Sequence, residues 1–206
     1  MRKLITIAGP QSSGKTTLLN FLKKKYKHIL LIDEVNPRSL TKNKNFGAAD
    51  TKADLEKKLI EKDIENINKI KSKTGLVIIE SGIYHCVYGE YFIDRQAANY
   101  FFRKYLETYK KFGSYTLFID TKPIISWNRR KFEYLRRIRS NGITDKKEVR
   151  KQLEKYKKII FDLYPIWKKY YKKISFEKRS INNDRLSIKN FLNKADKIIA
   201  KFLSSG

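Results

Sequence analysis

The segment KLITIAGPQSSGKTT, residues 3–17, constrains the fold of this chain more than any other stretch. Residues 4–8 form a short, apolar, β-branched run that is typical of a buried strand, and residues 18–22 begin an apolar pattern with helical spacing. Between them, GPQSSGKT matches the pattern GxxxxGK[ST]. A strand before the match and a helix after it are the context in which this pattern indicates a phosphate-binding loop. The segment therefore predicts an α/β domain that binds a nucleotide.

The residue types in this loop suit phosphate chemistry. Gly9 and Gly14 permit backbone conformations and close approaches that a Cβ atom would prevent. Backbone N–H groups that converge at a helix N-terminus favour negative charge. We expect Lys15 to reach the β- and γ-phosphates of ATP, and the Thr16 hydroxyl to bind Mg²⁺. The predicted nucleotide contacts are Gly9, Pro10, Gln11, Ser12, Ser13, Gly14, Lys15, Thr16 and Thr17.

Strand-like and helix-like segments alternate along the rest of the chain. Further strands are predicted at residues 29–33, 75–80, 115–120 and 173–181. Helices are predicted at residues 16–25, 52–72, 93–112, 123–139, 146–172 and 186–203, with an interruption of the fifth at Pro165. Residues 42–50 are expected to form a mobile loop near the acceptor site. The alternation favours one three-layer α/β domain, residues 1–206, around a mostly parallel sheet.

Acidic residues stand at the ends of two predicted strands. Asp33 and Glu34 follow the second strand, and Arg38 comes soon after them. Ligands of open α/β sheets bind outside the carboxyl ends of the strands, so these three residues are candidate substrate contacts. The alternative is a polar strand-to-loop transition that Pro37 ends. Glu80 closes the third strand in the manner of a Walker B acid, which holds Mg²⁺ directly or through water.

Aromatic residues are frequent in residues 81–92. The residues that could wall a pocket for a flat base are Tyr84, Tyr88, Tyr91, Phe92 and Tyr100, and Tyr84 is the candidate we single out. The alternative for each of them is packing against the sheet. Arg95, on the helix that follows, is a candidate phosphate contact.

Arginines cluster on the helix that Pro123 begins. Arg129 and Arg136 share one face of that helix, and arginine is suited to the charge on a transferring phosphoryl group. Residues 140–142 break the helix, so residues 129–150 are predicted to form a helix–loop–helix lid over the reaction. The alternative is a basic surface helix.

The chain is strongly basic, with 47 Lys and Arg against 21 Asp and Glu and a net charge of +26. Residues 122–179 hold 20 basic and 6 acidic residues, a net +14. This balance is typical of proteins with polyanionic partners, although lysines on solvated helix faces would give it too. The single cysteine, Cys86, allows no intrachain disulfide, and no apolar run is long enough for a membrane span or a signal peptide. We therefore expect a cytoplasmic protein.

The sequence resembles the P-loop nucleoside and nucleotide kinases, in particular the thymidylate kinase and deoxynucleoside kinase branch. The similar segments are GPQSSGKTT, DEVNPR, IIESGIY and LFIDTKPIISWNRR. The sequence is also similar to the AAA-type small-molecule kinase domain that includes ribosylnicotinamide kinases, whose E-x-x-x-R-like signature Glu34 and Arg38 would satisfy. The resemblance implies a five-stranded parallel sheet of order 2-3-1-4-5, a helical lid and phosphoryl transfer from ATP with Mg²⁺. Related kinases often form homodimers, and the sequence leaves the oligomeric state open.

The resemblance also implies residue roles. Glu34, with Asp33 as the second candidate, would contact or deprotonate the acceptor hydroxyl, and Glu80 would be the acid associated with the metal. Lys15, Glu34, Arg129 and Arg136 are the predicted catalytic residues, Arg129 because it lies in register from Pro123.

The chain also departs from the thymidylate kinase pattern. Ser81 and Gly82 stand where that pattern has an arginine, and the proline-glycine-glycine-threonine run after the second strand is missing. The acceptor therefore stays open among nucleosides, nucleotides and related small molecules. A nucleic-acid-associated NTPase or polynucleotide 5′-kinase that uses residues 122–179 is the alternative.

Overall fold

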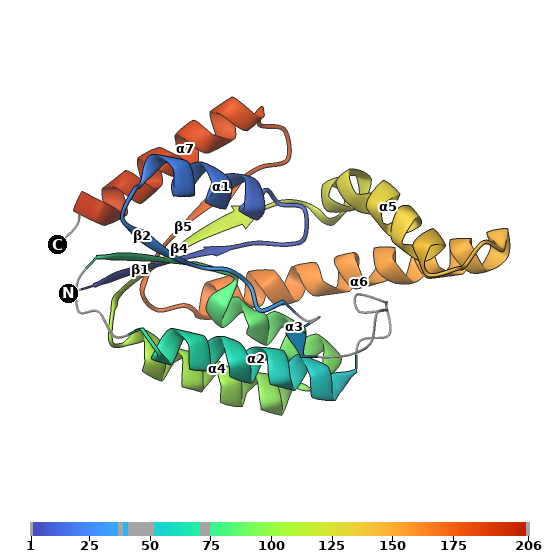
Figure 1. Cartoon of the computed structure of the whole chain (residues 1–206), viewed down its shortest axis with the longest axis horizontal. Helices are drawn as coiled ribbons and strands as arrows, with labels where there is room; N and C mark the ends of the chain where they lie inside the picture. Colours follow the sequence, from blue (N-terminus) through green and yellow to red (C-terminus); the bar gives the residue numbers. More distant parts are fainter. Residues whose placement is uncertain (1, 37–38, 41–51, 71–74, 205–206) are drawn as a thin grey trace.

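The computed structural model describes residues 2–36, 39–40, 52–70 and 75–204. Five strands form one sheet of order β2-β3-β1-β4-β5, and every neighbouring pair is parallel (Figure 1). The strands are β1 (Lys3–Ala8), β2 (Ile29–Ile32), β3 (Leu76–Glu80), β4 (Gly113–Asp120) and β5 (Glu177–Asn182). The predicted fold class and strand order are confirmed. The predicted loop at residues 42–50 lies outside the described residues.

Helices cover both faces of the sheet (Figure 1). One face carries α1 (Lys15–Lys25) and α7 (Ile188–Ser204), and the other carries α2 (Ala53–Asn68), α3 (Cys86–Phe92), α4 (Arg95–Tyr109) and the C-terminal half of α6 (Lys146–Lys173). A 3₁₀ turn, η2 (Gly82–His85), links β3 to α3, and α5 (Pro123–Ser140) precedes α6. None of the helices among the described residues has the length and apolar character needed to cross a membrane.

The inner strands β1, β3 and β4 bury residues on both of their faces because helices cover both faces of the sheet. In β1, Ile5 and Ile7 pack toward α1 and α7, while Leu4 and Ala8 pack toward α2, α4 and α6. The two cores are therefore separated by the sheet, and the loops at the carboxyl ends of the strands remain available for a site.

The structure corrects three predicted boundaries. Helix α6 continues through Pro165, because Leu163 and Trp167 on either side are buried in the core and hold the helix in place. Strand β5 consequently begins only at Glu177. The helix predicted at residues 93–112 is the single helix α4, Arg95–Tyr109, and it begins after Asp94, whose side chain accepts a hydrogen bond from the Ala97 N–H (2.7 Å).

Helices α5 and α6 form a hairpin whose far end projects away from the sheet (Figure 1). A separate apolar cluster holds the two helices together, and the Tyr134 ring stacks on Tyr156 with 4.3 Å between ring centroids. Trp127 stacks on the other face of Tyr134. The hairpin thus has its own packing, distinct from the two cores beside the sheet.

Candidate nucleotide and acceptor site

The loop between β1 and α1 passes very close to β4. Gly9 has φ 152°, and a Cβ atom there would lie 2.3 Å from the carbonyl oxygen of Ile119. Gly14 has φ 107° and is the N-cap residue of α1. Both glycines are thus required by space or by backbone conformation, as the sequence predicts for a phosphate-binding loop.

Lys15 lies folded over this loop. Its Nζ donates hydrogen bonds to the carbonyl oxygens of Gly9 (2.9 Å) and Pro10 (3.3 Å), and it sits 5.9 Å from the centroid of the Trp167 ring. Burial lowers the pKa of Lys15, and the charges of Glu34 and Glu80 act in the opposite direction. An ammonium group held by two carbonyls beside a loop of N–H donors is well placed to bind an anion.

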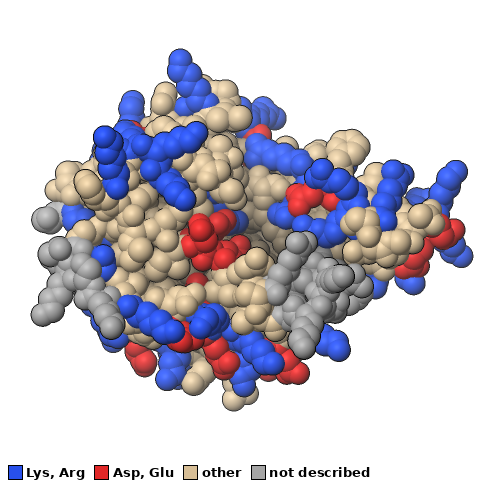
Figure 2. Space-filling model, viewed as in Figure 1, with Lys and Arg blue, Asp and Glu red and all other residues tan. Residues whose placement is uncertain are grey.

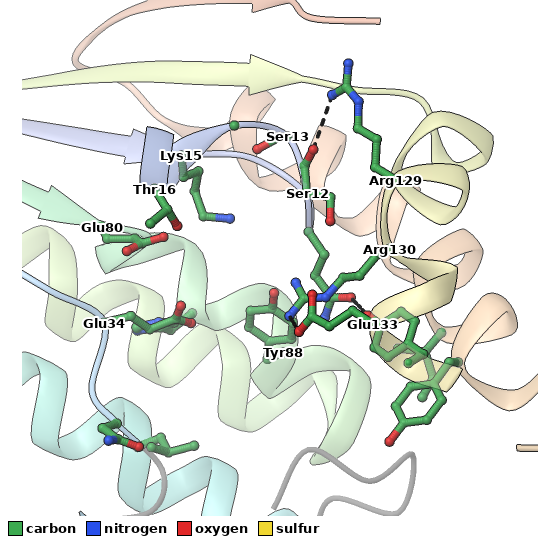
Figure 3. Close-up of a pocket in the computed structure, with 18 of the residues that line it drawn as sticks. Ser12, Ser13, Lys15, Thr16, Glu34, Glu80, Tyr88, Arg129, Arg130 and Glu133 are labelled. Atoms are coloured by element: carbon green, nitrogen blue, oxygen red, sulfur yellow. Dashed lines mark hydrogen bonds and ion pairs between the residues drawn. The ribbon is translucent and has the colours of Figure 1, made fainter. Parts of the chain in front are cut away.

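Arg129 and Asn183 brace the same loop from outside. The Arg129 guanidinium donates to the carbonyl oxygens of Ser12 (3.2 Å) and Asn183 (2.7 Å), and the Asn183 Nδ2 donates to the carbonyl of Ser13 (2.7 Å). Figure 3 shows Arg129 reaching past Ser12 on the side away from Lys15. In this structure Arg129 therefore supports the loop backbone, which differs from the charge-stabilising role that the sequence predicts.

Thr16, Glu80 and Lys15 lie together at the carboxyl ends of β1 and β3 (Figure 3). Burial raises the pKa of Glu80, and the nearby Lys15 lowers it. No group of three or more His, Cys, Asp or Glu among the described residues is arranged to hold a metal. Mg²⁺ in phosphoryl-transfer sites needs only one or two protein ligands beside substrate phosphates and water, so a Thr16 hydroxyl with the Glu80 carboxylate nearby fits it.

A buried histidine joins Glu34 to the core. His85 Nε2 lies 3.1 Å from Glu34 Oε1, and its Nδ1 lies 3.2 Å from Asp63 Oδ2. Tyr105 donates its hydroxyl to the same Asp63 oxygen at 2.6 Å. Asp63 is fully buried on α2 and His85 is 4% exposed, so this chain of polar groups runs from the protein interior to the rim of the site.

This chain of contacts sets the charge of Glu34. Burial alone would raise the pKa of Glu34, but the hydrogen bond and charge of His85, together with Lys15 and Arg130, lower it to about 2. Burial opposes the charge on His85, yet Asp63 and Glu34 on its two sides raise its pKa well above the ordinary value. Glu34 is therefore a carboxylate at neutral pH, and its side chain, 45% exposed, is accessible to a ligand.

The phosphate loop with Lys15 and Thr16, together with Glu34, Glu80 and His85, borders one cleft of about 900 Å³. Its floor is the loop from Gln11 to Thr17, and its walls come from α2, α3, α5 and α6. The other lining residues are Glu34, Val35, Asn36, Glu56, Leu59, Glu80, His85, Tyr88, Phe92, Arg129, Arg130, Glu133, Tyr134, Arg137, Tyr156 and Ile159. The phosphate loop and Glu34 thus face a single hollow.

Besides Arg129, the arginines of α5 that line the cleft are Arg130 and Arg137, and Arg136 is not among them. Both donate to Glu133 Oε1, at 3.3 and 3.0 Å, and Arg130 extends toward Tyr88 (Figure 3). Arg136 is exposed and does not line the cleft, and its catalytic role stays a prediction.

Of the predicted acceptor contacts, three described residues do not line the cleft. Tyr84 is fully buried and stacks between Phe118 and Trp167, so it is a core residue. Arg95 borders a separate hollow on α4, and Asp33 is exposed outside the cleft. Arg38 lies outside the described residues.

The sequence analysis missed several residues of the cleft. His85 and Glu56 carry no local motif, since their significance depends on partners far along the chain. Asn183 had a usable signal, because it directly follows β5 at the carboxyl end of the sheet. The missed cleft or loop contacts are Glu56, His85, Arg130, Glu133, Tyr134, Arg137 and Asn183.

Comparison with protein families agrees with this geometry. A family model described as an AAA domain matches residues 4–146, which contain the phosphate loop, Glu34, Glu80 and all of α5. The chain belongs to this family. No curated protein sequence matches the chain.

Solved structures show the same fold along nearly the whole chain. The YorR protein from Bacillus subtilis, in complex with phosphorylated GDP, is 14% identical with a TM-score of 0.55, over 98% of this chain and 99% of that one. Deoxyadenosine kinase from M. mycoides is similar in two structures. The one with the products dCMP and a flexible dCDP is 14% identical with a TM-score of 0.59, over 96% of this chain and 98% of that one. The one with bound dATP is 13% identical with a TM-score of 0.57, over 95% and 98%.

At these identities the comparisons establish the fold. The AAA domain is thus a P-loop NTPase domain with a structure like that of nucleoside and nucleotide kinases.

Proposed function

We propose that this AAA domain is an ATP- and Mg²⁺-dependent kinase that phosphorylates a hydroxyl or phosphate group of a nucleoside, nucleotide or related small acceptor. The observation that carries the proposal is the shared cleft, in which the phosphate loop with Lys15 faces the carboxylate of Glu34. A phosphate donor on one side and an acceptor held by an anionic oxygen on the other is the arrangement that phosphoryl transfer requires. The likeness to deoxyadenosine kinase supports the same reaction class.

Each group in the cleft has a role in this reaction. The loop N–H groups and Lys15 bind the β- and γ-phosphates. Glu34 accepts a hydrogen bond from the acceptor hydroxyl and orients its oxygen toward the γ-phosphate. Thr16 and Glu80 hold Mg²⁺, which when bound neutralises charge on the phosphate oxygens. Arg130 and Arg137 are the cations of α5 that face the cleft, and we assign them the charge of the phosphoryl group in transfer.

We also propose that residues 129–150 close as a lid. The α5–α6 hairpin packs through its own apolar cluster and carries both cleft-facing arginines. A unit with separate packing can move against the sheet while it keeps its internal contacts. Such a movement would bring the two arginines and the acceptor together and exclude water.

The thymidylate kinase branch has less support than the general kinase function. The AAA domain match favours the second resemblance, and Ser81 and Gly82 still stand where the thymidylate kinase pattern has an arginine. The nucleic-acid alternative has less support because several basic side chains within residues 122–179 already form ion pairs with acidic residues. Arg130 and Arg137 contact Glu133, and Lys168 contacts Asp120. A surface that binds a polyanion would have to use the other basic side chains of residues 122–179.

Release of ADP from ATP and Mg²⁺ tests the proposal. The purified protein is assayed with pools of nucleosides, nucleoside monophosphates, nicotinamide riboside and 5′-hydroxyl oligonucleotides. We expect one small-molecule pool to stimulate release, and Lys15→Ala to abolish it. Lys23→Ala removes the same charge from an exposed position on α1 and is expected to leave the rate unchanged. Wild-type turnover by the Lys15 variant would refute the mechanism, and stimulation by oligonucleotides alone, lost at moderate salt, would favour the nucleic-acid alternative.

A further inference from the structure

Glu56 is a buried carboxyl group of the cleft that phosphoryl transfer does not use. It lies in the first turn of α2, is 6% exposed, and lines the cleft together with Leu59. No described residue forms a hydrogen bond or an ion pair with its carboxylate. A carboxylate that is removed from bulk water and lacks a donor costs free energy that a bound ligand can recover.

A second acid on the same helix, Asp63, has hydrogen-bond partners within the protein and serves as a comparison for Glu56. Asp63 lies seven residues after Glu56, about two helical turns along the same face of α2. Asp63 is fully buried, and His85 and Tyr105 both contact its Oδ2. The protein therefore supplies donors to one acid of this face, whereas the other acid faces the cleft.

The charges of the cleft are separated between its two sides. Arg129, Arg130 and Arg137 all come from α5, and the one described acid on that side of the cleft, Glu133, is paired with Arg130 and Arg137. The side formed by α2, α3 and the segment after β2 presents Glu34 and Glu56, and its one described cation, His85, already lies between Glu34 and Asp63. Figure 2 shows basic side chains over the α5–α6 hairpin and a group of acidic side chains near the centre of the same face. A phosphate on the acceptor would face two carboxylates on the α2–α3 side.

We propose that the acceptor is an unphosphorylated nucleoside whose base carries an exocyclic amino group, and that Glu56 accepts hydrogen bonds from that group. The inference rests on the proposed kinase function. Amino groups of cytosine, adenine and guanine donate hydrogen bonds that a carboxylate accepts. Uracil and thymine present a carbonyl oxygen at the position of the cytosine amino group, which a carboxylate repels, and hypoxanthine lacks the amino group of guanine. Tyr88 and Phe92 on α3 line the same wall and offer aromatic surface to the base.

The experiment compares matched acceptors at pH 8, where Glu56 is ionised, with fixed ATP and Mg²⁺. Cytidine is paired with uridine, guanosine with inosine, and each nucleoside with its 5′-monophosphate, in ribo and deoxy forms. We expect kcat/KM to be about 10- to 100-fold higher for the amino-bearing member of each pair, the range of a charge-assisted hydrogen bond. We expect the nucleosides to be better acceptors than their monophosphates.

The variant Glu56→Gln should lower kcat/KM for cytidine or guanosine by about 10-fold or more, with the KM for ATP unchanged. The matched control is Glu61→Gln, which removes the same charge from an exposed position of α2. The proposal would be overturned if monophosphates were phosphorylated better than nucleosides. It would also be overturned if Glu56→Gln changed kcat/KM equally for acceptors with and without the amino group. Either result would leave the kinase function intact.

Calorimetric binding of nucleosides without ATP separates the two proposals if no acceptor is phosphorylated. That result would refute the proposed function. Binding of cytidine or guanosine that Glu56→Gln weakens at least 10-fold would still support the role of Glu56. Absence of nucleoside binding, or binding that Glu56→Gln leaves unchanged, would overturn it.

Discussion

Replacing Glu56 by glutamine is expected to stabilise the protein more at pH 8 than at pH 5. Burial in the cleft raises the pKa of Glu56 from 4.5 to about 7; the charge of His85 lowers it, and Glu34 raises it further. The unfolded chain releases this proton near pH 4.5, whereas the folded protein holds it until about pH 7. The carboxyl group therefore has its full stabilising effect below pH 4.5, and that effect is lost as pH rises to about 7.

The magnitude follows from the two pKa values. Each pKa unit corresponds to about 1.4 kcal/mol, so ionised Glu56 lowers the free energy of unfolding by about 3 kcal/mol above pH 7. Glutamine has nearly the shape of the protonated acid and carries no charge. The Glu56→Gln variant should consequently gain about 3 kcal/mol at pH 8 and less than about 1 kcal/mol at pH 5.

Urea-induced unfolding at pH 5 and pH 8, followed by circular dichroism, measures this difference. The Glu61→Gln protein is the control, since Glu61 is exposed and its loss should change stability by less than about 0.5 kcal/mol at either pH. Equal stability of wild type and Glu56→Gln at pH 8 would refute the reasoning, because it would mean that Glu56 is solvated or paired in the folded protein. A gain in stability from loss of a cleft residue is also the pattern expected of a group kept for binding.

Three further outcomes follow from the site and the fold. The His85→Gln variant should raise the pKa of Glu34 from about 2 toward 4.5, so the acid limb of the kcat/KM profile should move to higher pH; an unmoved limb would contradict the contact. Arg137→Ala should lower kcat about 100-fold, whereas Arg136→Ala should change it less than about 2-fold, and equal losses would show that neither arginine faces the phosphates. Gly82→Ala should cost about 1–3 kcal/mol in urea unfolding, since φ is 48° and a methyl group would meet a buried tyrosine hydroxyl at 2.2 Å; a neutral result would refute the close approach.

The sequence predicts the phosphate loop well because that site is contiguous. Eight successive residues supply the glycines, the lysine and the threonine, and their neighbours alone give the strand and helix around them. The acceptor side is assembled from distant segments. His85 lies 51 residues from Glu34, and the Asn183 amide that braces the loop lies 170 residues from Ser13. Local patterns carry no information about such pairs.

Helix rotation explains the difference between the predicted and the observed arginine face on α5. Successive residues of an α-helix point about 100° apart, so a change from Arg129 and Arg136 to Arg130 and Arg137 turns the predicted face through that angle. Both pairs have the same spacing of seven residues. Only the packing of Tyr134 and Ile138 against α6 decides which pair faces the cleft. The same ambiguity separates Tyr84, which is in the core, from Tyr88, which is in the wall.

Helix α6 packs in two separate apolar clusters, and each cluster contains one tryptophan that can serve as a fluorescent probe. The helix has 28 residues and is about 42 Å long, and it passes from the hairpin to the core. The chain has two tryptophans, Trp127 on α5 in the hairpin and Trp167 on α6 in the core. Trp127 packs in the hairpin cluster against Tyr134, while Trp167 lies in the core under the Lys15 ammonium.

Fluorescence of the two rings therefore reports two separate events. An anion that draws Lys15 away from Trp167 changes the charge next to that indole and shifts its emission. Trp127 responds to rearrangement of the hairpin instead. Replacement of either tryptophan by phenylalanine leaves a single fluorophore, so occupancy of the phosphate loop and movement of the hairpin can be timed independently in one unlabelled protein.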